Sequence, residues 1–210
     1  MNLRKTIWLL LMLFMAFSVK SQRYQDKEKY TIGIKVGTCF SSLIGQELKN
    51  PKVKFGFQGG VYYRQRLGTS LHLLTEMNAS FRGSNFNNGK TGYSRISLLN
   101  LDLPVLLMFD VSAKKNEHLV FMGPQATYIA TSDLYVNPDN VSKYKNLDLK
   151  PFDVMAVAGY HYNGYYMGWQ VAVKYGLLDI NDGIMFIDVK PVTGTGKLIR
   201  NISLELSMFF

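Results

Sequence analysis

Apolar and polar residues alternate along most of this chain with a period of two. Between Ile202 and Phe210, for instance, Ile, Leu, Leu, Met and Phe occupy every second position, with Ser and Glu among them. A period of two, together with β-branched and aromatic residues, predicts β-strands with one apolar and one polar face. Eight segments carry this pattern: residues 32–41, 55–66, 70–82, 94–109, 119–131, 151–162, 165–178 and 202–210.

The links between those segments alternate strictly between short and long. The short links are 67–69, 110–118 and 163–164, the last being Asn-Gly, which is typical of tight hairpins. The long links, rich in Gly, Asn, Asp, Ser and Lys, are 42–54, 83–93, 132–150 and 179–199. Short periplasmic turns and long outside loops are typical of outer-membrane barrels. We therefore expect an all-β fold, an eight-stranded antiparallel up-and-down transmembrane β-barrel, closed by pairing of 202–210 with 32–41.

The beginning of the chain predicts export. Arg4 and Lys5 precede an apolar run of eleven residues from Ile7 to Phe17, and small residues follow as far as Ser21. A bilayer-spanning helix needs about 20 apolar residues, so this run indicates a secretory signal peptide cleaved near Ser21. The expected organisation is a signal peptide over 1–21, a periplasmic tail over 22–31 and a barrel over 32–210, in the cell outer membrane.

Composition narrows the classes of partner. The formal net charge is +9 and the mean hydropathy is −0.02, a value that suits a barrel whose apolar and polar residues cancel. Nucleic acid is not expected, because the chain carries an export signal and no basic run interleaved with stacking aromatics. The positive charge instead predicts contact with phosphate-bearing outer-membrane lipid and lipopolysaccharide. The single cysteine, Cys39, excludes an internal disulfide.

Short motifs in seven of the predicted strands carry a family resemblance. They are Gly33-Ile-Lys-Val-Gly37, Gly56-Phe-Gln-Gly-Gly60, Leu74-Thr-Glu76, Leu101-Asp-Leu-Pro104, Gly123-Pro124, Tyr175-Gly-Leu, and Asn201 with Phe210. In this order and spacing the chain resembles the PorT family of outer-membrane β-barrels typical of Bacteroidetes. The resemblance implies the fold and the location. One branch of that family is associated with type IX secretion and gliding machinery, and no motif here singles out that branch.

Charged residues fall on the polar faces of the predicted strands. An eight-stranded barrel has room inside only for side chains, and charges buried there must be paired. We therefore predict a structural ion-pair network that fills the lumen, with a narrow ion or proton path as the alternative. Its members would be Lys35, Arg64, Glu76, Arg82, Asp102, Asp153, Lys174 and Glu205.

Catalytic and metal-binding chemistry has little support. An acyl hydrolase needs a nucleophile, a base and an orienting acid in contact, but no Gly-x-Ser-x-Gly elbow occurs. The His and Cys residues show no metal-ligand spacing. We expect no enzyme activity, no cofactor and no metal, with a small lipid-modifying enzyme and a soluble calycin-like carrier as alternatives. The residues considered for hydrolysis are His72 and His161 with Ser80, Ser97 and Ser203.

The predicted role is that of a monomeric structural or interaction scaffold, because long loops on a rigid barrel usually carry binding function. The partner would be an envelope protein, a surface glycan or a secretion component. Phe210 is the predicted barrel-assembly signal, read by the barrel-assembly machinery. The predicted loop contacts are Tyr135, Tyr144, Lys145, Met185, Phe186 and Lys190.

Overall fold

The computed structural model describes residues 30–45, 51–88, 92–112, 117–136, 142–145, 149–164, 167–182, 184–187, 190–193 and 198–210. The predicted signal peptide and most of the predicted periplasmic tail lie outside these residues. No helix in the described part of the chain is long and apolar enough to cross a membrane. The described strands are β1 (Tyr30–Gly45), β2 (Pro51–Lys52), β3 (Lys54–Arg66), β4 (Leu71–Asn88), β5 (Gly92–Asp110), β6 (Glu117–Val136), β7 (Ser142–Lys145), β8 (Phe152–Asn163), β9 (Gly168–Gly176), β10 (Ile184–Ile187), β11 (Lys190–Thr193) and β12 (Ile199–Phe209).

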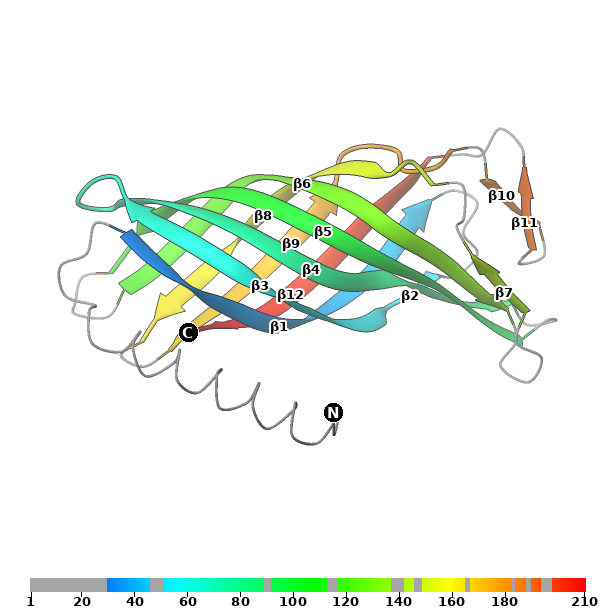
Figure 1. Ribbon diagram of the computed structural model, residues 1–210, viewed down its shortest axis with the longest axis horizontal. Helices are drawn as coiled ribbons and strands as arrows, with labels where there is room; N and C mark the ends of the chain where they lie inside the picture. Colours follow the sequence, from blue (N-terminus) through cyan, green and yellow to red (C-terminus); the bar gives the residue numbers. More distant parts are fainter. Residues whose placement is uncertain are drawn as a thin grey trace, which may run out of the picture.

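Eight of these strands form a closed antiparallel barrel (Figure 1). Around the ring the order is β1, β3, β4, β5, β6, β8, β9 and β12, and every neighbouring pair is antiparallel. Each of the eight overlaps one of the eight segments predicted from the sequence. The predicted fold class is therefore confirmed. Closure matters because a closed barrel leaves no backbone edge unpaired in a membrane.

The seam of the barrel joins β1 to β12. Their register runs from Lys35 opposite Phe209 to Gly45 opposite Ile199, which confirms the predicted pairing. Beyond the end of β12, the backbone N–H of Ile34 donates to the carbonyl of Phe210 at 3.0 Å. The Phe210 N–H donates back to the Ile34 carbonyl at 2.9 Å. The seam is therefore hydrogen-bonded as far as Phe210.

The predicted long links contain more strand residues than expected, and the link 83–93 is the clearest case. Residues 83–93 were expected to form a loop, but β4 continues to Asn88 and β5 begins at Gly92. The two strands continue here through mainly polar residues, so the alternation of apolar and polar residues that marks the rest of these strands is absent. Gly83 has a φ of +143°, and a Cβ there would lie 2.1 Å from the Ile96 carbonyl oxygen. Glycine therefore permits an irregular strand at a point where the sequence suggests a stop.

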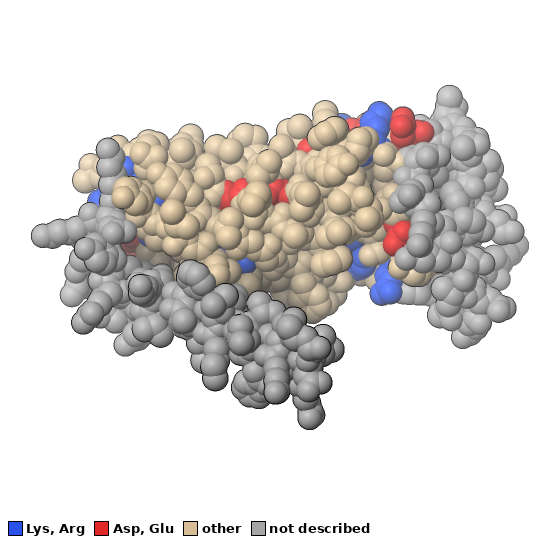
Figure 2. Space-filling model, in the orientation of Figure 1, with Lys and Arg blue, Asp and Glu red and all other residues tan. Residues whose placement is uncertain are grey.

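The two faces of the barrel wall have opposite polarity. Large apolar side chains point outward, and Phe57, Met77 and Leu103 are 59%, 60% and 52% exposed. Buried polar and charged side chains point inward. Figure 2 shows a mainly uncharged outer surface, with most of the charged residues toward the ends of the barrel. A soluble calycin-like carrier would have its apolar face inside, so that alternative does not fit this barrel.

Aromatic side chains gather at two levels of the outer surface. Near the long-link end, the Phe55 ring lies 5.4 Å from Phe40 and 4.8 Å from Phe57. Near the short-turn end, Tyr30 stacks on Tyr63 at 6.5 Å. Phe55 and Tyr63 are eight residues apart in β3, or about 26 Å along the strand. Aromatic belts on both sides of an apolar band are typical of a barrel that spans a bilayer.

Candidate functional site

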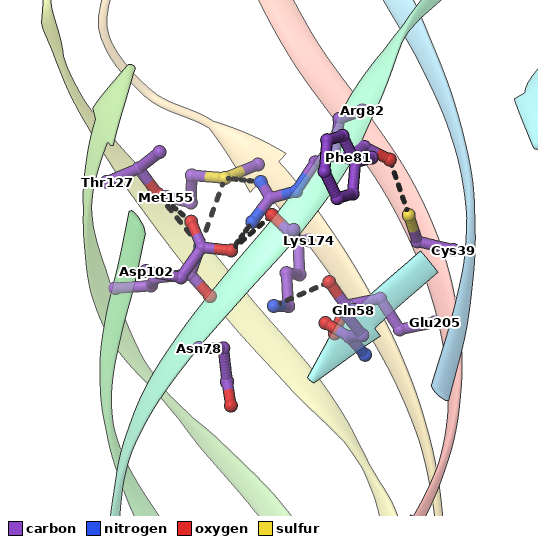
Figure 3. A network of polar contacts seen from close by, with 12 residues as sticks. Cys39, Gln58, Asn78, Phe81, Arg82, Asp102, Thr127, Met155, Lys174 and Glu205 are labelled. Carbon is purple, nitrogen blue, oxygen red and sulfur yellow. Dashed lines mark hydrogen bonds and ion pairs between the residues drawn. The ribbon is translucent and has the colours of Figure 1, made fainter. Parts of the chain in front are cut away.

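The centre of the lumen holds a polar network around Asp102 of β5 (Figure 3). Arg82 of β4 forms an ion pair with this carboxylate, and both side chains are fully buried. Ser80 donates to the same carboxylate at 2.7 Å, Thr127 at 2.8 Å and Gln125 at 3.0 Å. Three adjacent strands, β4, β5 and β6, therefore converge on one buried charge.

Two further ion pairs join strands inside the lumen. The Lys35 Nζ lies 2.7 Å from the Glu76 Oε2, which links β1 to β4. The Lys174 Nζ lies 2.6 Å from the Glu205 Oε1, which links β9 to β12. Asn78 also donates to Glu76 at 2.6 Å. These side chains are almost completely buried, so both charges of each pair are removed from water together.

Arg64 and Asp153, two other residues predicted for the network, form no ion pair with the described residues of this centre, although Asp153 lies opposite Thr127. Arg64 pairs at 3.2 Å with Glu117, which the sequence reasoning did not select, near the short-turn end. Asp153 lies near the long-link end, and within the described residues no ion pair reaches it. Its carboxylate instead accepts hydrogen bonds from the backbone of Leu178 and Val154. Six of the eight predicted residues therefore form direct pairs with one another.

An apolar cluster fills the lumen at the short-turn end. Phe209 points inward, and its ring lies 4.8 Å from both Tyr62 and His161. The Lys35 Nζ lies 5.4 Å from the same ring, so this cluster adjoins the ionic centre directly. We call it the short-turn cluster; its members are Tyr62, Leu74, Leu106, Met108, Leu119, Phe121, Val157, Ala172 and Phe209.

A second apolar cluster closes the long-link end. The segment after β9 folds into the mouth there, where the Ile180 N–H donates to the Ile199 carbonyl and the Lys150 N–H donates to the Ile180 carbonyl. The Asp179 carboxylate accepts a hydrogen bond from the Ile199 N–H at 2.8 Å. We call this group the long-link cluster; it comprises Leu43, Phe86, Ile96, Leu98, Ile129, Leu134, Ile180 and Ile199. An apolar layer therefore lies at each end of the ionic centre, and the sequence reasoning missed both layers.

The residues considered for catalysis do not come together. Ser80 donates a hydrogen bond to Asp102. The side chain of His161 interacts with Gln170. Within the described ranges, no hydrogen bond joins His72 or His161 to any serine. A search of the same residues finds no group of three His, Cys, Asp or Glu side chains that could hold a metal.

The wall of the barrel is much taller on one side. At the long-link end, the last residue pair between β6 and β8 is Tyr128 with Phe152. Beyond that pair β6 continues for eight more residues, about 26 Å along the strand. We call residues 82–88 of β4, 92–99 of β5 and 129–136 of β6 the extended wall, and β7 pairs with its edge. Arg95 lies over the ring of Tyr135 at 5.7 Å on the outward face. In Figure 1 this part of the sheet extends to the right, away from the C-terminus.

The predicted loop contacts fall on several strands. Tyr135 belongs to the extended wall, and the backbone of Tyr144 and Lys145 lies in β7. The backbone of Met185, Phe186 and Lys190 lies in the hairpin of β10 and β11. Apart from Tyr135, the side chains of these residues lie outside the described part of the structure. Because of this hairpin, part of the predicted long link 179–199 has β-strand structure.

Comparison with known proteins identifies a family. A family model described as "Outer membrane protein beta-barrel domain" matches residues 21–182. Among solved structures, Ail, the attachment invasion locus protein of Yersinia pestis, is 12% identical with a TM-score of 0.48, and the match covers 87% of this chain and 98% of that one. The complex of Ail with the heparin analogue sucrose octasulfate gives 12% identity, a TM-score of 0.49 and the same coverage. Neisserial surface protein A is 11% identical with a TM-score of 0.48, again over 87% of this chain and 98% of that one. A comparison with curated proteins finds none that matches.

Proposed function

Because this chain belongs to the outer membrane protein beta-barrel domain family, we propose that it is a closed, non-enzymatic scaffold in the outer membrane. The observation that carries the proposal is the filled lumen, in which an ionic centre lies between the short-turn cluster and the long-link cluster. A barrel filled in this way offers its outer surface, rather than its interior, to partners. The proposal includes export with cleavage near Ser21 and a monomeric state in the membrane.

The extended wall is the proposed interaction surface. Long links face the outside in barrels of this kind, so the wall would stand above the outer leaflet. Its outward face presents Arg95 over Tyr135, and arginine and tyrosine are the residue types that most often dominate binding energy at interfaces. The strands on both sides hold this pair on a rigid sheet, which reduces the entropy lost on binding. Tyr144, Lys145, Met185, Phe186 and Lys190 are proposed to extend the same surface.

Conductance tests the closed lumen. In planar bilayers, the purified and refolded protein is expected to give no steady single-channel steps, because apolar side chains occupy both ends of the lumen. Folding is verified beforehand by the heat-modifiable gel shift that is typical of barrels. Reproducible steps of one size from several folded preparations would instead support the ion-path alternative.

Photo-crosslinking tests the interaction surface. A photoreactive amino acid at position 135 is expected to give a discrete, light-dependent adduct in intact cells, since Tyr135 lies on the outward face of the extended wall. The matched control places the same group at Val120, which is exposed on the outer face of the barrel near the short-turn end. Equal adducts at both positions, or none at position 135, would contradict the proposal.

The identity of the adduct separates the remaining alternatives. A component of type IX secretion or gliding machinery would support the branch of the PorT family that is associated with that machinery. Another envelope protein or a surface glycan would support a general scaffold. The alternative of a small lipid-modifying enzyme is less favoured, because His72 and His161 contact no serine through a hydrogen bond in the described residues. A lipid A hydrolase assay on the refolded protein would reveal such an activity.

A further inference from the structure

One arginine lies on the apolar outer surface of the barrel. Arg200 is on β12 near the long-link end, opposite Ile44 of β1. Leu198 and Ile202 share its face of the strand, because side chains two residues apart point the same way. Leu198 is 43% exposed and Ile44 is 47% exposed, so apolar surface surrounds the guanidinium on both strands.

Arg200 has an orienting partner but no counter-charge. Its Nη1 donates to the Tyr175 hydroxyl at 3.1 Å, and the guanidinium lies 5.8 Å from the centre of that ring. Among the described residues, no carboxylate forms an ion pair with Arg200, and its side chain is partly exposed on the outer face. A partly exposed cation that is held by an aromatic ring and lacks a counter-charge is suited to receive an external anion.

The position of Arg200 along the barrel axis indicates which kind of anion it would meet. Leu204 of β12 pairs with Phe40, a member of the aromatic belt, and Arg200 is four residues farther toward the long-link end. That separation is about 13 Å along the strand, which places Arg200 toward the long-link edge of the apolar band. A basic residue costs about 2–4 kcal/mol on the lipid face at the bilayer midplane but close to zero near the interface, where phosphate groups lie.

We infer that Arg200, oriented by Tyr175, binds the phosphate group of lipid A, the phosphorylated glycolipid of the outer leaflet. The guanidinium would donate a charge-assisted hydrogen bond to the phosphate, and the neighbouring apolar side chains would contact the acyl chains. This site lies on the barrel and not on the extended wall. The inference therefore depends on the outer-membrane location and not on the scaffold role.

Native mass spectrometry of the folded protein in detergent micelles tests the inference, with lipid A and dephosphorylated lipid A as probes. The variant Arg200→Ala is expected to bind lipid A about tenfold more weakly, since a hydrogen bond between charged groups is lost. Arg200→Lys should keep part of the affinity, because lysine retains the charge but lacks the planar fork. Lys150→Ala is the matched control, since it removes one exposed positive charge near the same end of the barrel.

The outcomes are distinct. Support requires loss of lipid A binding in Arg200→Ala, unchanged binding in Lys150→Ala, and weak binding of dephosphorylated lipid A by every variant. Unchanged binding in Arg200→Ala would overturn the inference, as would equal binding of lipid A with and without its phosphate. The heat-modifiable gel shift verifies that each variant is folded. Crosslinking at position 135 should be the same in Arg200→Ala, so failure of the scaffold proposal would be seen separately.

Discussion

The substitution Asp102→Ala is expected to lower the free energy of unfolding by about 3–5 kcal/mol, the usual cost of removing one partner from a buried ion pair. Arg82 would remain fully buried with its charge uncompensated, and Ser80, Thr127 and Gln125 would lose a shared acceptor. Unfolding in denaturant from lipid vesicles measures the loss. Trp169 is the reporter, because it is exposed on the outer face and is the one tryptophan outside the predicted signal peptide.

A double variant separates charge from shape in this network. Replacing Arg82 with Met and Asp102 with Leu removes both charges and keeps most of the volume. Buried pairs replaced in this way are often close to neutral, so the double variant should be markedly more stable than Asp102→Ala alone. A loss below about 1 kcal/mol in Asp102→Ala would show that the network does not stabilise the barrel. A double variant as unstable as the single one would place the cost in packing and not in charge.

The barrel itself was predictable because its strands alternate so regularly. Outward positions such as Phe57, Met77 and Leu103 are apolar and the intervening positions are small or polar, so faces and strand number follow from a period of two. The terminal strand was also predictable, since its alternation runs without a break from Ile202 to Met208. Pairing with β1 then follows from the need to close the sheet.

The two apolar clusters were not predictable by the same reasoning. In Leu73-Leu74, Leu98-Leu99 and Leu106-Leu107, neighbouring positions on opposite faces are both leucine, so alternation gives no sign that the second face is buried. The inward Phe209 precedes the outward Phe210 in the same way. The short-turn cluster and the long-link cluster are therefore found only when the register of all eight strands is known.

Partners within the lumen were predictable as a set but not as pairs. The sequence places Lys35, Glu76 and Arg82 on inner faces, but it does not give the stagger between strands that decides which side chains meet. Glu117 was missed because the predicted link 110–118 included it, whereas β6 already begins at Glu117. Arg64 pairs with Glu117, and not with a residue of the central network.

Removal of Phe210 is expected to prevent most of the chain from reaching a folded state in the outer membrane. The Ile34 N–H and carbonyl both bond to Phe210, and each would lose its partner at the seam. An unpaired backbone group in hydrocarbon costs several kcal/mol, so two such losses would be comparable to the whole free energy of unfolding of a typical protein. Fractionation of cell envelopes, followed by the heat-modifiable gel shift, measures the folded fraction.

The variant Phe210→Ala distinguishes the assembly signal from the seam. It keeps both backbone hydrogen bonds to Ile34 and removes only the outward ring, so refolding into lipid vesicles should remain close to that of the unaltered chain. If the ring is read by the barrel-assembly machinery, the same variant should assemble poorly in cells. Phe210→Tyr, which keeps an aromatic ring, is the matched control and should assemble normally. Normal assembly of Phe210→Ala in cells would remove the signal role and leave Phe210 as a residue of the seam alone.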